Sequence, residues 1–205
     1  MTATINASTS SGVIVTSDTS GSLAIQSNGT TIATAGSTGL TISSYTAGAS
    51  LLTSGTAQNS TSGTSIDFTS IPSWVKRITV MLKSVSTNGT SVPTIRLGTG
   101  GVAATTGYST QSSVIAAASV GTINSTGGYD IYSNAASYAL NGSVQFTNLS
   151  GNNWVGAGVL SFDGVAGTLT IAGYVGLSGV LDMVRITTAA GTDTFDTGSI
   201  NILYE

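Results

Sequence analysis

Short runs of Val, Ile and Leu, separated by clusters of Gly, Ser, Asn and Thr, recur along the whole chain. In "RITVMLKSV" the apolar residues fall on one side of an extended backbone, namely Ile78, Val80, Leu82 and Val85. Such alternation is typical of a half-buried strand. No segment combines an apolar period of 3.6 residues with helix caps. We therefore predict an all-β chain.

From residue 64 onward the strand pattern is strong. Extended segments are expected at 64–68, 76–86, 92–97, 111–118, 129–133, 137–148, 153–162, 166–177, 181–188 and 197–204. Asp163-Gly164 is a hairpin signal, and the last two segments are expected to pair with each other. Strands at this spacing predict that residues 64–205 form an antiparallel, jelly-roll-like β-sandwich. The expected core anchors are Trp74, Trp154, Phe68, Phe146 and Phe162.

Residues 1–63 contain one charged residue, Asp18, and very short apolar steps eight to ten residues apart. Each step offers one or two large side chains, too few to offset an ordering cost of roughly 1–2 kcal/mol per residue. We therefore expect this region to be a stalk or particle anchor that orders in a homotrimer or on another protein. A flexible Ser/Thr/Gly linker is the alternative. The expected trimer contacts are Val13, Ile14, Val15, Leu23, Ile25, Ile32, Leu40 and Ile42.

The composition argues against most catalytic and cofactor sites. Histidine and cysteine are absent, so a serine nucleophile has no histidine base and zinc has no preferred ligand. Only 6% of residues are charged and the net charge is -3, which argues against nucleic acid as a partner. The N-terminus does not resemble a signal peptide, and no apolar run is long enough for a membrane span. We expect neither an enzyme nor a cofactor.

Three groups of residues are candidates for a site. Asp193 and Asp196 are the closest pair of carboxylates; a turn and a calcium site are both open for them. A Ser–Lys pair using Lys76 or Lys83 lacks a nucleophile motif. The basic residues clustered after Trp74 are expected to mark a solvent face or to pair with Asp, within the sheet or on a neighbouring copy, and Arg185 beside Asp182 likewise.

Several segments resemble a known class of protein. "IPSWVKRITVMLKSVSTNGTSVPTIRLG", "GYSTQSS" and "LDMVRITTAAGTDTFDTGSINILYE" resemble the C-terminal β domain of tailed-bacteriophage virion proteins of the tail-fibre or fibre-like type. "STSSGVIVTSDTSGSLAIQSNGTTIATAGSTGLTIS" is similar to N-terminal segments of phage structural proteins. The resemblance implies a non-enzymatic, homotrimeric virion component whose N-terminus attaches to the tail or capsid. It carries no catalytic motif.

Three functions remain open at this point. The first is a structural fibre, spike or decoration protein located in the virion and contacting other virion proteins. The second is a receptor- or glycan-binding module at a fibre tip, because aromatic rings and amides suit sugars. Its expected surface residues are Asn88, Tyr108, Tyr129 and Tyr132. The third is an enzyme that degrades host polysaccharide.

Overall fold

A computed structural model of the chain describes residues 21–37, 39–42, 52–116, 119–133, 135–164 and 166–205. The chain divides into two compact units, Met1–Ser50 and Leu51–Glu205. The first unit contains the strands β1 (Leu23–Ser27), β2 (Thr30–Gly36) and β3 (Gly39–Ile42). The second contains β4 (Thr53–Ser54), β5 (Gln58–Asn59), β6 (Ser65–Phe68), β7 (Arg77–Thr87), β8 (Pro93–Thr99), β9 (Val102–Ala103), β10 (Tyr108–Ala116), β11 (Ser119–Ser125), β12 (Tyr129–Asp130), β13 (Leu140–Ser150), β14 (Asn153–Phe162), β15 (Gly167–Gly176), β16 (Met183–Thr188) and β17 (Phe195–Tyr204).

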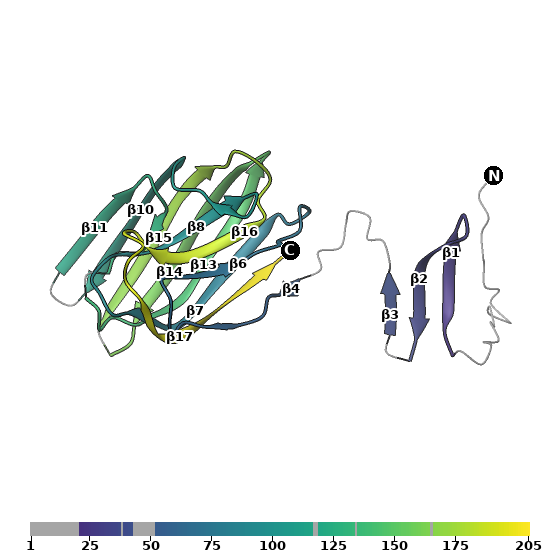
Figure 1. Cartoon of the computed structure of the whole chain (residues 1–205), viewed down its shortest axis with the longest axis horizontal. Coiled ribbons are helices and arrows are strands. Elements are labelled where there is room, and N and C mark those ends of the chain that lie inside the picture. Colours follow the sequence, from purple (N-terminus) through teal and green to yellow (C-terminus); the bar gives the residue numbers. More distant parts are fainter. Residues whose placement is uncertain (1–20, 38, 43–51, 117–118, 134, 165) are drawn as a thin grey trace. The chain divides into compact units, whose positions relative to one another are not determined.

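The first unit is a three-stranded antiparallel sheet in the order β1-β2-β3 (Figure 1). The three described apolar steps of the N-terminal region lie in these strands, which confirms the short meandering strands expected there. β1 and β2 join through Asn28 and Gly29, with φ of 49° and 75°. Positive φ at both central residues is what a tight two-residue hairpin requires, and Asn-Gly adopts it readily.

The second unit is an antiparallel β-sandwich, which confirms the predicted all-β fold. Its nine-stranded sheet runs β11-β10-β15-β14-β13-β7-β17-β4, with β5 also paired to β17. Its five-stranded sheet runs β12-β8-β16-β6, with β9 paired to β8. Figure 1 shows the smaller sheet lying across the larger one. Buried side chains from both sheets form one apolar cluster, which joins Ile95 and Ile186 of the small sheet to Val80 and Phe146 of the large sheet.

A bulge in β7 explains how its apolar residues share one face despite an irregular spacing. Leu82 is opposite Gly142 on β13, and Val85 is opposite Leu140, so β7 carries one extra residue there. Ser84 has a positive φ of 51°, and its N–H donates to the Asn141 side chain at 2.8 Å. The extra residue returns Val85 to the buried face.

The sandwich begins earlier than the sequence indicates. Residues 51–63 were expected in the N-terminal region, but they belong to the second unit. β4 and β5 pair with β17, and the Ser60 hydroxyl donates to the Thr197 carbonyl at 2.9 Å. This stretch is short of apolar residues, so its place depends on hydrogen bonds to the last strand rather than on a pattern visible in the sequence.

The two final strands do not pair with each other, and that expectation was wrong. β16 lies between β8 and β6 in the small sheet, whereas β17 lies against β7 in the large sheet. The connection between them crosses from one sheet to the other. Alternating apolar residues indicate a strand with one buried face but do not specify its neighbour.

Four of the five predicted core anchors are buried: Trp154, Phe68, Phe146 and Phe162. Trp74 is not, because 51% of it is exposed. Its ring lies 6.0 Å from that of Tyr204, just before β7 begins. Trp74 therefore covers the surface beside the C-terminus rather than filling the core.

Candidate functional site

The predicted trimer contacts that can be placed lie on the three-stranded sheet. Leu23, Ile25 and Ile32 are 43%, 49% and 37% exposed. The register pairs Leu23 with Ala35 and Ile25 with Ala33 across β1 and β2. The backbones of Leu40 and Ile42 lie in β3, opposite the same two alanines. Val13, Ile14 and Val15 lie outside the described residues.

Two of the four predicted surface-binding residues are in the core, and the prediction is wrong for them. Tyr108 is 4% exposed and Tyr129 is fully buried. The Tyr108 side chain reaches from β10 in the large sheet to β8 in the small sheet. Its hydroxyl donates to the Leu97 carbonyl at 3.1 Å and accepts from the Leu97 N–H at 2.9 Å. Tyr129 packs edge-on against Tyr108 and Phe146, with ring centroids 5.9 and 4.9 Å away.

A glycine makes room for the buried Tyr129 ring. A Cβ on Gly156 would lie 2.6 Å from Phe146 and 2.9 Å from Tyr129, closer than real contacts allow. Tyr129, which was expected at the surface, thus fills the space left by Gly156 on β14. Burial raises the pKa of both Tyr108 and Tyr129 above the usual range, because the phenolate would lose its hydration.

The other two predicted surface residues differ from each other. Asn88 is exposed in the β7–β8 connection, but its carboxamide oxygen already accepts from the Thr194 N–H at 2.9 Å. Tyr132 is half-buried, and its ring covers Gly121 of β11. The four residues do not form one site.

The basic residues mostly have partners within the chain. Arg77 pairs with Glu205, and Lys76 donates to Asn148 at 3.5 Å. Arg185 binds Asp67 through two bonds, from Nε at 2.7 Å and from Nη2 at 2.6 Å. The bond to Asp67 raises the pKa of the Arg185 guanidinium further. Pairing within the small sheet is therefore confirmed for Arg185, with Asp67 rather than Asp182.

Arg96 and Asp182 also bind the backbone of their own unit. Arg96 donates from Nε to the Gly127 carbonyl at 2.8 Å, and Asp182 accepts from the Gly101 N–H at 3.1 Å. Arg96 lies directly opposite Arg185 on the neighbouring strand. The small sheet thus carries these ionic and charge-assisted contacts on its outer side.

The two carboxylates considered for a calcium site bind other parts of the sandwich, Asp193 a loop and Asp196 the strand β7. Asp193 accepts from the Ser91 N–H at 2.7 Å, and Asp196 accepts from the Ser86 hydroxyl. Among the residues described there is no group of three side chains suited to a metal ion. The same residues include no helix of the length and apolarity needed to cross a bilayer.

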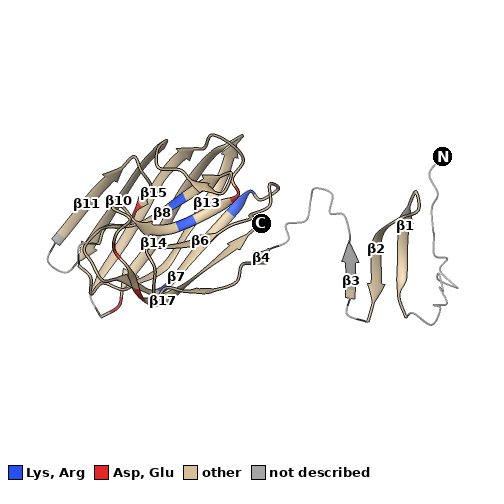
Figure 2. Ribbon diagram, viewed as in Figure 1, with Lys and Arg blue, Asp and Glu red and all other residues tan. Residues whose placement is uncertain are grey.

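The outer face of the large sheet shows a different chemistry. Five neighbouring strands, β11, β10, β15, β14 and β13, contain no charged residue at all. Figure 2 shows these strands free of the colours that mark charge, whereas the small sheet carries several charged positions. We call the solvent side of these five strands the uncharged face.

The uncharged face mixes amides and hydroxyls with exposed apolar side chains, which include Ile115, Val120, Leu149 and Val159. Tyr174 of β15, 55% exposed, lies opposite Val155 of β14, which is 40% exposed. Two residues further along, on the same face, Ala172 lies opposite Ala157. Gln111 on β10 and Gln145 on β13 are the outer neighbours of this alanine pair, and Asn124 on β11 follows Gln111.

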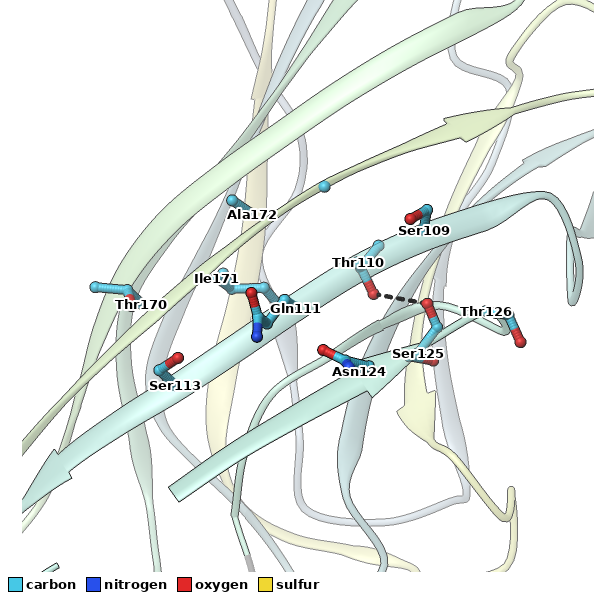
Figure 3. Close-up of a pocket in the computed structure, with 11 residues that line it drawn as sticks. Ser109, Thr110, Gln111, Ser113, Asn124, Ser125, Thr126, Thr170, Ile171 and Ala172 are labelled. Atoms are coloured by element: carbon cyan, nitrogen blue, oxygen red, sulfur yellow. Dashed lines mark hydrogen bonds between the residues drawn. The ribbon is translucent and has the colours of Figure 1, made fainter. Parts of the chain in front are cut away.

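Two separate open depressions lie in this face. One, of about 680 Å³, lies over β11, β10 and β15 and includes Ala172 in its lining; the other, of about 340 Å³, lies over β13 and β14 and includes Ala157. Figure 3 shows the first of them, with Gln111 and Asn124 extending from neighbouring strands. Neither amide takes part in any hydrogen bond among the described residues. The sequence pattern did not single out Tyr174, Gln111 and Asn124; the available signal was the absence of Asp, Glu, Lys and Arg from the segments expected at 111–118, 137–148, 153–162 and 166–177.

Comparison with protein-family models, curated proteins and solved structures found no match to this chain.

Proposed function

We propose that the chain is a non-enzymatic structural component of a phage virion, a homotrimeric fibre or spike. Its N-terminal unit attaches to the tail or capsid, and its β-sandwich projects outward. Two kinds of support lead to this proposal: the resemblance of the quoted segments to fibre-like virion proteins, and the exposed apolar residues of the three-stranded sheet.

The observation that carries the proposal is the exposure of Leu23 and Ile25. Both are more than 40% exposed although their strand is fully paired with β2. A single layer of three strands has a face that only another layer can cover. Covering a large aliphatic side chain contributes roughly 1.5–3 kcal/mol, so three copies that share this face gain what one copy cannot. A partner virion protein on the particle would cover the same residues in attachment.

Light scattering of the purified full chain tests the trimer directly. We expect a mass three times that of the 20.3 kDa subunit. The double change Leu23→Asp and Ile25→Asp places charges on the proposed contact, so we expect it to give the mass of one subunit while the sandwich stays folded by circular dichroism.

The matched control is Val102→Asp on β9, because Val102 is also apolar and 68% exposed but belongs to the sandwich. It is expected to leave the trimer intact. A wild-type chain that runs as a single subunit at micromolar concentration, or a double variant that stays trimeric, contradicts the proposal. Localisation of the chain in a reconstruction of the particle tests the attachment to tail or capsid.

A further inference from the structure

The strand β11 forms one edge of the large sheet and has a free side. Among the strands that the structure describes it pairs only with β10, and Figure 1 shows it at the end of the sheet. In an antiparallel strand, alternate residues direct their N–H and C=O groups away from a given neighbour. No hydrogen bond joins the backbone of residues 119–124 to a described residue outside β10. These outward groups are therefore open to another strand.

The other edges of the sandwich are protected in ways that β11 is not. The edge strands β4, β5, β9 and β12 have two residues each. β6, at the other end of the small sheet, has four residues and carries Asp67. Short strands, charges, prolines and bulges are the features that keep a sheet edge from pairing with another chain.

β11 has none of these features. Its sequence, "SVGTINS", contains no charged residue and no proline. It pairs with β10 in an unbroken register from Ser119 to Ser125, so it has no bulge. A strand of seven residues is about 23 Å long. β11 therefore offers a regular, uncharged edge to an incoming strand.

Exposed apolar side chains lie beside this edge. Val120 on β11 is 72% exposed, and its cross-strand neighbour Ile115 on β10 is 67% exposed. Val120 has Ile115 on one side and no described strand on the other. A strand added to β11 would cover the open side of Val120, and this burial would add to the backbone hydrogen bonds.

The absence of charge indicates which partner fits. A two-fold contact brings an edge against a copy of itself, so a charged edge would meet like charges from the second copy. β11 meets none. Antiparallel pairing centred on Thr122 places Thr122 opposite Thr122 of the second copy, and threonine pairs are favourable across strands. We infer that β11 is a self-association edge, which pairs antiparallel with β11 of a second copy and joins two large sheets into one.

This contact is separate from the one proposed for the three-stranded sheet. A single pair of strands buries less surface than a standard protein interface, so we expect a reversible association at high concentration. It would link two subunits side by side, or two trimers where the chain is trimeric.

Sedimentation velocity of the full chain over a concentration series tests the inference. The mass at the lowest concentration reports the contact of the three-stranded sheet. A rise towards at least twice that mass, from micromolar to submillimolar concentration, reports the edge. Thr122→Lys places like charges at the centre of the paired strands, so it should abolish the rise and leave the lowest mass unchanged. The two contacts can therefore fail separately.

Thr170→Lys is the matched control. Thr170 on β15 is also exposed and lies in the same cross-strand row as Thr122, with Ser113 of β10 between them. This variant should associate as the unchanged chain does. A rise that survives Thr122→Lys overturns the inference, and one that only Thr170→Lys abolishes assigns the contact to the sheet face instead. No rise in mass leaves β11 to a strand of a different protein, and the inference then fails.

A thiol cross-link measures the register without the lysine variants. The chain contains no cysteine, so Thr122→Cys introduces a single thiol in each copy. Side chains directly opposite each other in an antiparallel pair have Cβ atoms about 4.5–5.5 Å apart. A short bifunctional thiol reagent should therefore join two copies of Thr122→Cys at high concentration, and it should not join copies of Thr170→Cys. Equal cross-linking of both variants, or none of either, contradicts the pairing of β11.

Discussion

The three-stranded sheet and the sandwich are built from similar strands, yet they differ in what the strands can bury. β2 reads "TTIATAG" and β15 reads "GTLTIAGYVG", both mixtures of Thr, Ala, Gly and one or two large aliphatic residues. On β15, Leu169 and Ile171 are 0% and 3% exposed. On β1 and β2, Ile25 and Ile32 are 49% and 37% exposed.

The difference comes from the second layer. In the sandwich the small sheet covers the buried side of the large one, and a single apolar cluster joins both. The three-stranded sheet has hydrogen bonds between its strands, but the described residues of its unit, 21–37 and 39–42, supply no second layer. Strand pairing therefore gives the local structure in both units, while burial of apolar surface gives stability only where a second sheet lies across the first.

The largest effect on stability is expected from a change at Phe146, which tests whether the sandwich completes its own core. It is fully buried and packs against Tyr129 with ring centroids 4.9 Å apart. We expect Phe146→Ala to lower the free energy of unfolding of the sandwich by about 3–5 kcal/mol, because it leaves a cavity in a packed core. Denaturant unfolding followed by tryptophan fluorescence measures the loss, since Trp154 is buried in the same cluster.

Ile25→Ala removes an apolar residue of the first unit and serves as the partner measurement. We expect it to leave the unfolding midpoint of the sandwich unchanged. Phe146→Leu, which keeps most of the volume, should lose less than half of what Phe146→Ala loses. Equal losses in Ile25→Ala and Phe146→Ala would contradict the claim that only one of the two units completes its own core.

Much of the sandwich could be predicted because its strands have one apolar and one polar face. The segment expected at 153–162 is β14 to the residue, and 76–86 differs from β7 by one residue at each end. β11 was missed, since "SVGTINS" holds only two large apolar residues and its inner face carries Gly121. β4 and β5 were missed for a similar reason: two-residue strands carry no period.

The pairing of the strands was harder to predict than their positions in the sequence. Nothing local distinguishes β16, which joins the small sheet, from β17, which joins the large one, because both are half-apolar. The burial of Tyr129 was also hidden, since it depends on the space above Gly156, a residue far away in sequence. The uncharged face, in contrast, is a property of composition and alternation, and it can be found in the sequence once the five strands are known to be neighbours.

Alkaline pH is expected to destabilise the sandwich but not the strands β1, β2 and β3, and the effect is smaller than that of Phe146→Ala. Residues 21–42 contain no titratable side chain, whereas Tyr108 and Tyr129 are buried in the sandwich. Their pKa is raised in the folded state, so folding is favoured by the neutral phenol. This contribution is complete below the unfolded pKa of about 10 and is lost as the pH rises above it, by about 1.4 kcal/mol per pH unit for each tyrosine.

Tyr108→Phe sharpens this test. It removes one of the two ionisations, so the alkaline loss of stability should become less steep. At neutral pH it should cost about 1–3 kcal/mol, because the buried Leu97 N–H loses the acceptor that it has at 2.9 Å. Unfolding curves recorded between pH 7 and 11 measure both effects. A stability that stays constant to pH 11 would show that the buried phenols do not govern the alkaline limit of the sandwich.

The smallest effect is expected from Tyr129→Phe, although Tyr129 is the more deeply buried of the two tyrosines. Its hydroxyl has no hydrogen-bond partner among the described residues; the Gly156 backbone lies close but outside hydrogen-bonding geometry. Removal of a buried hydroxyl that has no partner removes the free-energy cost of burying an unpaired polar group. It keeps the ring that packs on Phe146. We therefore expect a free energy of unfolding at neutral pH within about 0.5 kcal/mol of the unchanged chain, or slightly above it. A loss as large as that of Tyr108→Phe would mean that the hydroxyl is bonded in solution, and it would place Tyr129 with the polar groups that hold the two sheets together.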